Sequence, residues 1–407
     1  MLPVHPMPVN AGDTTFMVIS TALVALMTPG LAFFYGGLVE KKNSVTIMLQ
    51  SFVAFAIVTI MWIFGGFSLV FGDSVSGAGI IGNPAQFFAF KDVTLLTNAT
   101  YGGHIPFLLY FMYQLMFAVI TFPLATGAFA NRMKFGAYVK ILILWMIFIY
   151  FPVAHWVWGN GFLAKMGFVD FAGGTVIHAT AGFGALACII FLGKRKYVGK
   201  HGNLGMVALG TGLLWFGWYG FNSGGVLGAN ELAAVAFANT AIAAAVAMVV
   251  WMIITYFEEK HLSFVEAVTG SIAGLATITP AAGYVSPLAA VAIGIIAAIW
   301  CFLCVKFAKK MGWDDALDVW GTHGMGGCIG SILIGVFAQS AINGVHAGVH
   351  QFLVQLFGVV LVSVYSFIVT FIIIKLVDMT GKIRVSEETE KEGLDKTILH
   401  ESFSIDE

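Results

Sequence analysis

The feature that most constrains this chain is a series of long apolar runs, because roughly 20 apolar residues can cross a bilayer as a helix. Such runs are separated throughout the chain by short polar or glycine-rich segments. They span approximately 14–38, 45–70, 106–129, 137–157, 171–192, 203–224, 232–257, 264–284, 287–308, 317–338 and 349–377. The sequence therefore predicts an all-α integral membrane protein with eleven transmembrane helices, of which the eleventh is long.

The composition excludes a soluble globular chain. Of the 407 residues, 59% are hydrophobic and only 10% are charged, whereas soluble domains are about half apolar and about a quarter charged. The formal net charge is −1, and no basic stripe lies outside the short loops, so the sequence gives no support for a nucleic-acid partner. The surface that this chain is expected to contact is the lipid bilayer.

The basic residues predict how the chain crosses the membrane. Of the 20 Lys and Arg residues, only Lys91 and Lys165 fall on one side of the predicted spans, and all others fall on the opposite side. Cytoplasmic loops carry the excess of Lys and Arg in membrane proteins. We therefore expect a multi-pass protein of the cell (inner) membrane, with its N-terminus outside and its C-terminus in the cytoplasm.

The composition changes after Met379, where the chain becomes polar and charged. This change predicts a transmembrane domain over residues 1–378 and a cytoplasmic tail over residues 379–407 that is not a folded domain of its own. A tail that ends here and a tail truncated before a further domain both fit the sequence.

An ionisable pair of residues recurs with the same spacing in the fifth and tenth runs. Asp170 precedes His178 by eight residues, and Asp315 precedes His323 by eight. Because the two runs are five spans apart, they cross in opposite directions, which indicates an inverted five-helix repeat with a site near the membrane midplane. Eight helical residues rise about 12 Å, so both rings are expected near the bilayer centre.

Each of these histidines is followed four residues later by a glycine, Gly182 or Gly327. A single intramembrane histidine is consistent with a buried, hydrogen-bonded ring, but two in related positions favour a functional pair that faces a cavity. A metal site would need a third ligand, and no HxxH or HxxE motif lies nearby, so we expect neither a metal nor a cofactor. Asp170 is expected to cap the start of its helix.

Aromatic residues gather toward the outer ends of the third, fourth and sixth runs. Interfacial belts of Trp are common in membrane proteins, so each residue alone is consistent with a structural role. Together, above two buried histidines, they indicate a cup whose π faces hold a small monovalent cation, with each contact contributing about 0.5–2 kcal/mol. These residues are Tyr113, Phe117, Trp156, Trp158, Trp215, Trp218 and Phe221.

Several specific stretches occur in order along the chain, among them AHWVWGNGFL, DFAGGTVIHATAG, GWYGFNSGG, TPAAGYVSPL and DDALDVWGTHGMGG. Through them the chain resembles the Amt/Mep/Rh family of ammonium transporters, on the bacterial-like Amt side, over almost its whole length. The resemblance implies a homotrimer with one narrow pore per subunit, which moves ammonium or ammonia and has no enzymatic activity.

The resemblance also implies roles for individual residues. Trp158 and Phe117 would recruit ammonium outside, Asp170 would order this site, and Trp218 would line its entrance. Phe117 and Phe221 would stack below it as a phenyl gate.

His178 and His323 would line the pore beneath the gate and relay or control the proton that ammonium releases. Ammonia would then cross an apolar pore, which fits the physics because desolvating an ion costs far more than passing a neutral molecule. An imidazole can carry a proton near neutral pH.

The chain departs from the family pattern at three places. Gly225 stands where a Ser commonly supplies an oxygen to the outer site. Ala130-Asn131-Arg132 replaces the usual AER, and the tail keeps EGLD as Glu392-Gly393-Leu394-Asp395 but continues differently. In the family this tail bears on pore activity and on docking of PII-type regulatory proteins, and some members carry a signalling module there.

Three functions therefore remain open from the sequence. The first is an ammonium transporter, and the second is an ammonium sensor that signals through its C-terminal tail. The third, a membrane-embedded metalloenzyme built on the two histidines, has the least support.

Overall fold

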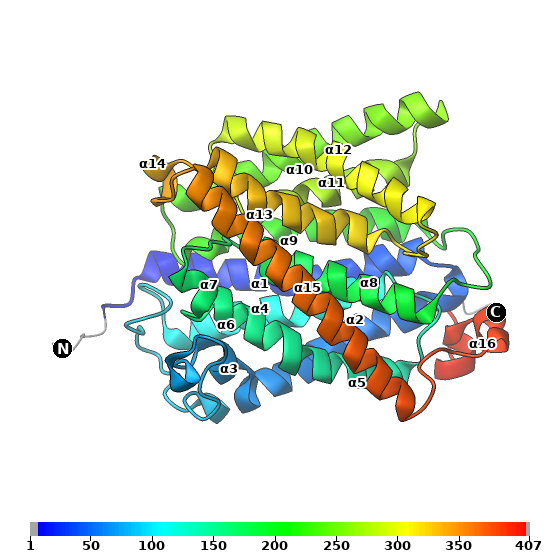
Figure 1. The fold of residues 1–407 in the computed structure, drawn as a ribbon, viewed down its shortest axis with the longest axis horizontal. Helices are drawn as coiled ribbons and strands as arrows, with labels where there is room; N and C mark the ends of the chain where they lie inside the picture. Colours follow the sequence, from blue (N-terminus) through cyan, green and yellow to red (C-terminus); the bar gives the residue numbers. More distant parts are fainter. Residues whose placement is uncertain (1–6, 404–407) are drawn as a thin grey trace.

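The computed structural model describes residues 7–403. The predicted transmembrane domain begins at residue 1 and the predicted tail ends at residue 407, so these two boundaries lie outside the described residues. The long helices run side by side between two ends of the molecule (Figure 1). α1 (Ala11–Leu38) begins at one end, and α16 (Glu387–Glu392) lies at the other (Figure 1).

The remaining helices follow in chain order. They are α2 (Ser44–Met61), α3 (Phe67–Phe71), α4 (Phe107–Thr126), α5 (Phe135–Trp145), α6 (Phe151–Trp158), α7 (Phe162–Lys165), α8 (Thr180–Leu192), α9 (Leu204–Ser223), α10 (Glu231–Glu259), α11 (Phe264–Ile278), α12 (Pro287–Lys310), α13 (Met325–Phe337), α14 (Ser340–Asn343) and α15 (Val349–Met379). The 3₁₀ turns are η1 (Lys41–Asn43), η3 (Val75–Gly77), η4 (Phe88–Phe90) and η7 (Gly224–Val226). The π-helical turns are η2 (Trp62–Gly66), η5 (Met146–Tyr150), η6 (Gly174–Ala179), η8 (Trp320–Gly324) and η9 (Asp395–Leu399).

Nine of the predicted spans are confirmed in the described residues as helices long and apolar enough to cross a membrane. The eighth and tenth are shorter than predicted. α11 has 15 residues and ends at Ile278, because Pro280 cannot continue the helical hydrogen bonding. The tenth span is divided between η8 and α13. Together these segments confirm an all-helical membrane protein of about eleven helices.

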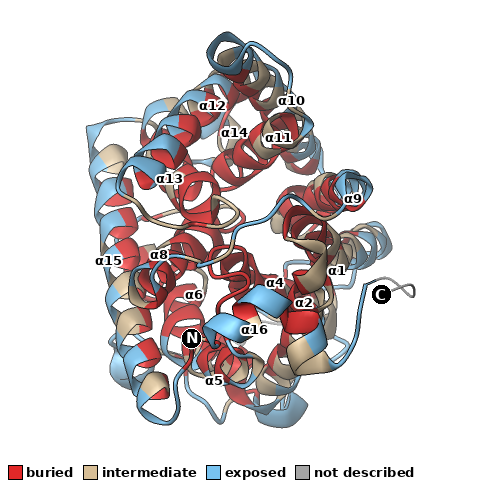
Figure 2. Cartoon of the chain, turned by 90° about the vertical axis from the view of Figure 1, so that its right-hand side faces the viewer, coloured by how far each residue is buried: buried red, intermediate tan, exposed pale blue. Residues whose placement is uncertain are grey.

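The outer surface of the bundle is apolar. On α15, Val360, Val364, Ile368, Ile372 and Leu376 recur every four residues, and each is 49–53% exposed. Figure 2 shows the same division, with buried residues turned toward the interior of the bundle and exposed residues outward. A continuous apolar stripe along an outer helix is expected of a surface that faces lipid. The chain is therefore a multi-pass integral membrane protein.

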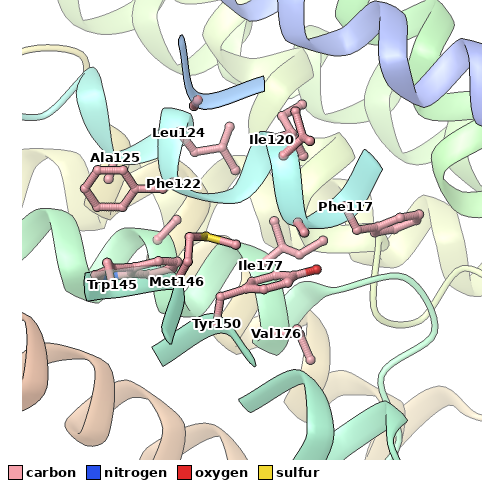
Figure 3. Close-up of a cluster of buried hydrophobic side chains, with 14 of the residues drawn as sticks. Phe117, Ile120, Phe122, Leu124, Ala125, Trp145, Met146, Tyr150, Val176 and Ile177 are labelled. Carbon is pink, nitrogen blue, oxygen red and sulfur yellow. The ribbon is translucent and has the colours of Figure 1, made fainter. Parts of the chain in front are cut away.

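α4 passes through the centre of the bundle, where it is buried on nearly every side. Phe122 packs against Trp145, with ring centroids 5.2 Å apart. Met146, Val176 and Ile177 close the same cluster from η5 and η6 (Figure 3). This core ties the segment that carries His178 to the middle of the molecule.

Basic residues from distant loops meet at the α16 end. Arg132, which is fully buried, donates to the carbonyl of Gly193 at 2.7 Å and lies 3.3 Å from Asp314. Arg195 pairs with the same carboxylate at 2.7 Å. Burial alone would raise the pKa of Asp314, but the hydrogen bond from Arg195 and the charge of Arg132 hold that pKa below its usual value. The carboxylate therefore stays ionised and joins three loops.

The tail after α15 is docked on this end of the bundle. Asp395 accepts hydrogen bonds from the backbone N–H groups of Val45 at 2.9 Å and Thr46 at 2.7 Å, which start α2. The N–H of Leu394 donates to Oδ1 of Asn43 at 2.9 Å. A carboxylate at a helix N-terminus satisfies N–H groups that the helix leaves unpaired. The tail thus contacts the membrane domain through backbone groups as well as charges.

The two histidine-bearing segments cross at glycines. A Cβ atom on Gly182 would lie 2.2 Å from Cα of Gly324, and one on Gly327 would lie 2.2 Å from the carbonyl oxygen of Gly174. Real Cβ atoms essentially never come within 3.0 Å of such atoms. The glycines that follow each histidine by four residues are therefore required for the close approach of the two segments.

We expect Gly182→Ala to lower the free energy of unfolding by about 1–3 kcal/mol, because overpacking forces the backbone apart. Thermal unfolding of the purified protein in detergent would show a lower Tm. The matched control is Gly212→Ala, since a Cβ at Gly212 meets nothing within 4 Å and alanine favours the helix. An unchanged Tm for Gly182→Ala would contradict the close crossing.

Candidate functional site

The two intramembrane histidines contact each other through their ring nitrogens. Nδ1 of His178 and Nδ1 of His323 are 3.3 Å apart, and the ring centroids are 5.2 Å apart with the planes 21° from parallel. Each ring lies in a π-helical turn, η6 or η8, a form of helix found frequently at functional sites. A contact between two ring nitrogens requires one to donate and the other to accept. The contact therefore fits one proton between the two nitrogens, with the tautomers of the rings deciding which nitrogen donates.

Trp218 lies beside this pair. Its ring is 5.4 Å from that of His178 and 6.5 Å from that of His323, nearly parallel to both, and its Nε1 donates to Oγ1 of Thr279 at 2.8 Å. The resemblance assigns Trp218 to the entrance of the outer site, but the structure places it next to the histidines, in the wall of an inner cavity.

The inner cavity is small and almost entirely apolar. Its volume is about 10 Å³, close to the smallest cavity that holds a single water molecule, about 10–15 Å³. Nε2 of His178 is buried there without a hydrogen-bond partner among the described residues. Besides the two histidines and Trp218, the lining consists of Met27, Leu31, Phe34, Ile120, Leu124, Ile177, Leu214, Phe221 and Ile272.

Two phenyl rings separate the inner cavity from an outer one. Phe117 and Phe221 are stacked with centroids 4.4 Å apart and planes tilted by 31°. Phe117 lines the outer cavity and Phe221 the inner cavity. Tyr113 fixes both, because its hydroxyl donates to the carbonyl of Phe221 at 2.9 Å and its ring packs edge-on against Phe117. The passage between the cavities is closed by these rings.

The outer cavity has a volume of about 370 Å³. Four of the five residues expected at the recruiting site line it, namely Phe117, Trp158, Asp170 and Gly225. Trp158 stands at 84° to Phe117 with centroids 5.9 Å apart, and its Nε1 donates to the backbone carbonyl of Asp170 at 2.9 Å. The indole is therefore held beside the phenyl gate, in the wall of the outer cavity.

The Asp170 carboxylate accepts four backbone hydrogen bonds. Oδ1 accepts from Gly173 and Gly174, both at 2.8 Å, and Oδ2 accepts from Thr175 at 2.8 Å and Val176 at 3.0 Å. These bonds occupy about all the lone-pair positions of a carboxylate. The capping role expected for Asp170 is confirmed, and the side chain orders the turn that leads into η6.

The second half of the chain repeats this arrangement in a weaker form. Oδ2 of Asp315 accepts from the backbone N–H of Trp320 at 2.7 Å, at the start of η8. The spacing of eight residues between aspartate and histidine thus corresponds to the same local structure in both segments: a capping carboxylate, a π-helical turn and an inward-facing ring.

Comparison with known proteins establishes the family. A model described as the Ammonium Transporter Family matches residues 15–403. The chain belongs to the ammonium transporter family. This is a family of membrane transporters, not of enzymes.

Several members of the family match this chain over nearly their whole length. The ammonium transporter of Aquifex aeolicus is 45% identical over 94% of this chain and 91% of its own. Ammonium transporter Amt1 of Archaeoglobus fulgidus is 43% identical over 94% and 97%. Crystallised Mep2 of Saccharomyces cerevisiae is 34% identical with a TM-score of 0.86, covering 94% and 91%. A solved structure described as a sensor Amt protein is 30% identical with a TM-score of 0.88, covering 96% and 98%.

Two of the positions at which this chain departs from the family pattern have a structural basis. A Cβ on Gly225 would lie 3.1 Å from the carbonyl oxygen of Phe171 and 3.3 Å from its ring, so a larger residue there is tightly confined. Asn131 has a φ of 68°, in the left-handed region where Asn is several-fold enriched. Asn in place of the usual Glu therefore suits the backbone of the α4–α5 connection.

Sequence reasoning missed part of the outer cavity. Gln114, Tyr284 and Asn343 also line it. Tyr284 stands within TPAAGYVSPL, but its position beside Asp170 depends on how the α11–α12 connection folds back over the outer end. No spacing in the sequence signals that contact. Within residues 7–403, no group of three or more His, Cys, Asp or Glu side chains is placed to hold a metal ion.

We expect Asp170→Ala to reduce stability more than Asp170→Asn. Alanine leaves four backbone N–H groups without an acceptor, and each unsatisfied buried group costs about 1–3 kcal/mol. Asparagine keeps one oxygen that accepts two of these bonds. Thermal unfolding of both variants in detergent measures the difference. Equal stability of the two variants, combined with equal loss of ammonium binding, would instead assign the main role to the charge of the carboxylate.

Proposed function

We propose that this chain is an ammonium transporter that recruits ammonium in the outer cavity, removes its proton at or below the phenyl gate, and passes ammonia through the histidine-lined cavity. The observation that carries this proposal is the order of three parts: an outer cavity walled by Trp158, a closed pair of phenyl rings, and an apolar inner cavity that holds the His178–His323 pair.

The physical chemistry of each part suits this sequence of steps. The faces of Trp158 and Phe117 attract a cation, with about 0.5–2 kcal/mol per contact depending on desolvation. An inner cavity of about 10 Å³ leaves no room for a hydration shell. Losing that water without compensation would cost an ion far more than it would cost neutral ammonia. The 3.3 Å contact between the imidazole nitrogens supports a role for the pair in relaying or controlling the released proton.

The orientation proposed for the chain places the outer cavity outside the cell and the tail in the cytoplasm, in the cell (inner) membrane. The clustering of Arg132, Arg195 and Arg384 at the α16 end supports it, because cytoplasmic loops carry the basic residues.

Two kinds of protein partner belong to the proposal. The first is a homotrimer, which the apolar outward faces of α9 and α10 support. Phe216 is 57% exposed, and Tyr219 and Phe237 stack outside the bundle with centroids 4.3 Å apart.

The second partner is a PII-type regulatory protein or a signalling module at the C-terminal tail. The docking of Asp395 on the start of α2 supports it, since a partner that binds the tail would act on the membrane domain directly.

The second candidate function is an ammonium sensor. It is favoured by the similarity to the sensor Amt protein, whose chain is covered to 98%, and by the contact between tail and membrane domain. Transport remains the better supported function, because the phenyl gate and both pore histidines are retained. A sensor would bind ammonium and change the exposure of its tail without appreciable flux.

We expect His178→Ala and His323→Ala to fold and assemble normally but to lose ammonium-dependent transport. Proton transfer by a positioned side chain contributes about 100-fold to 10,000-fold to a rate, so a loss of that order is expected. Uptake of labelled methylammonium into cells measures it. His261→Ala is the control, because that side chain is 67% exposed and lies outside both cavities. Wild-type uptake by the double variant would end the proton-relay proposal.

We expect an N-terminal tag to be accessible from outside intact cells and a C-terminal tag to be accessible only after lysis. The unequal distribution of Lys and Arg is the physical reason. Protease protection on whole and broken cells measures both tags. An internal N-terminus would contradict the proposed orientation and place the outer cavity on the cytoplasmic side.

A further inference from the structure

The polar side chains that line the outer cavity differ in whether they already have hydrogen-bond partners within the protein. The Tyr113 hydroxyl donates to a backbone carbonyl, Tyr110 and Gln114 bond to each other, and the Asp170 carboxylate is occupied by four N–H groups. The side chain of Tyr284 has no hydrogen-bond partner among residues 7–403.

Asn343 is the other lining side chain without such a partner in the described chain. It lies on the short helix α14, between residues that are largely exposed. Tyr284, by contrast, packs its ring against Phe171, which also lines the cavity.

The backbone and ring of Tyr284 are held firmly although its hydroxyl is not. Its N–H donates to Ala281 at 2.8 Å, and its carbonyl accepts from Gln339 at 2.9 Å. The ring packs edge-on against Phe171, with centroids 5.6 Å apart and planes at 81°. By contrast, the buried hydroxyls of Tyr35 and Tyr138 each donate to a backbone carbonyl. A half-buried phenol that lines a cavity and has no protein partner among the described residues is available to a ligand or water.

The electrostatic surroundings favour a cation at this hydroxyl. Burial, with a further contribution from the negative charge of Asp170, raises the pKa of Tyr284 well above its usual value. The group therefore remains a neutral hydroxyl, whose oxygen can accept a hydrogen bond. A donor with positive charge placed between Tyr284 and Asp170 is attracted by the same carboxylate that disfavours the phenolate.

We propose that the Tyr284 hydroxyl accepts a hydrogen bond from ammonium in the outer cavity and so supplies the side-chain oxygen that Gly225 lacks. Phe171 links the two positions, since its carbonyl and ring lie 3.1–3.3 Å from where a Cβ of residue 225 would be and its ring contacts Tyr284. Tyr284 thereby becomes a positioning residue for the substrate. This inference rests on the proposed recruitment of ammonium in that cavity.

The test is Tyr284→Phe, which removes one oxygen and keeps the ring that packs on Phe171. The half-saturating ammonium concentration of flux into proteoliposomes should rise roughly threefold to tenfold, the size of one hydrogen bond, while maximal flux stays near the wild-type value. Tyr365→Phe is the matched control, because its hydroxyl bonds to the carbonyl of Phe148 outside the cavity.

A second variant tests whether the two positions substitute for each other. Gly225→Ser should restore affinity more strongly in the Tyr284→Phe background than in the wild type, since the two oxygens would serve one ligand. An unchanged half-saturating concentration in Tyr284→Phe would overturn the inference. So would a fall in maximal flux alone, or a shift caused by Asn343→Ala but not by Tyr284→Phe.

A direct measurement of ammonium binding distinguishes a failure of this inference from a failure of the proposed function. Ammonium titration followed by the intrinsic fluorescence of the tryptophans gives the affinity of each variant in detergent. Binding without flux in the wild type would reject transport, and the affinity ratio of wild type to Tyr284→Phe would still decide the role of the hydroxyl. Flux in the wild type with equal affinities in both proteins would reject the role of Tyr284 alone.

Discussion

The close crossing of the two histidine-bearing segments is the constraint on which the rest of the pore depends. Gly182 rests against Gly324, and Gly327 against Gly174, at separations that admit no side chain. Without a hydrophobic force between helices in lipid, such contacts between small residues allow segments to pack closely. They set the 3.3 Å contact between the imidazoles of His178 and His323, and the aromatic and aliphatic walls are built around that pair.

The outer part of the site depends on a different interaction, the saturation of one carboxylate by backbone groups. Asp170 fixes the turn before η6, its carbonyl holds the indole of Trp158, and Phe171 follows it between Gly225 and Tyr284. One residue thus orders the outer cavity and the start of the segment that carries His178. In the proposed function, the aromatic faces and the nearby carboxylate favour a cation in the outer cavity, and the apolar inner cavity disfavours it below the phenyl rings.

Much of this arrangement could be predicted from the sequence. The lengths of the apolar runs gave nine spans directly, and the repeated spacing of aspartate and histidine gave the facing pair. The early end of α11 is a local effect of Pro280 that the sequence already contains. The other differences depend on contacts between distant residues. Trp218 stacks on the histidines and lines the inner cavity, not the outer one. Tyr284 enters the cavity only because the α11–α12 connection packs on Phe171, and no periodicity reports that contact.

In the function that we propose, ammonium loses its proton at or below the phenyl gate and crosses this chain as ammonia. The most direct measurement is an ammonium pulse on proteoliposomes, with membrane current and internal pH recorded together. We expect ammonium uptake that exceeds that of protein-free liposomes and saturates with concentration, in the range where ammonium binds the outer cavity. Uptake no greater than in protein-free liposomes, together with ammonium-dependent protection of the tail, would contradict it and identify a sensor.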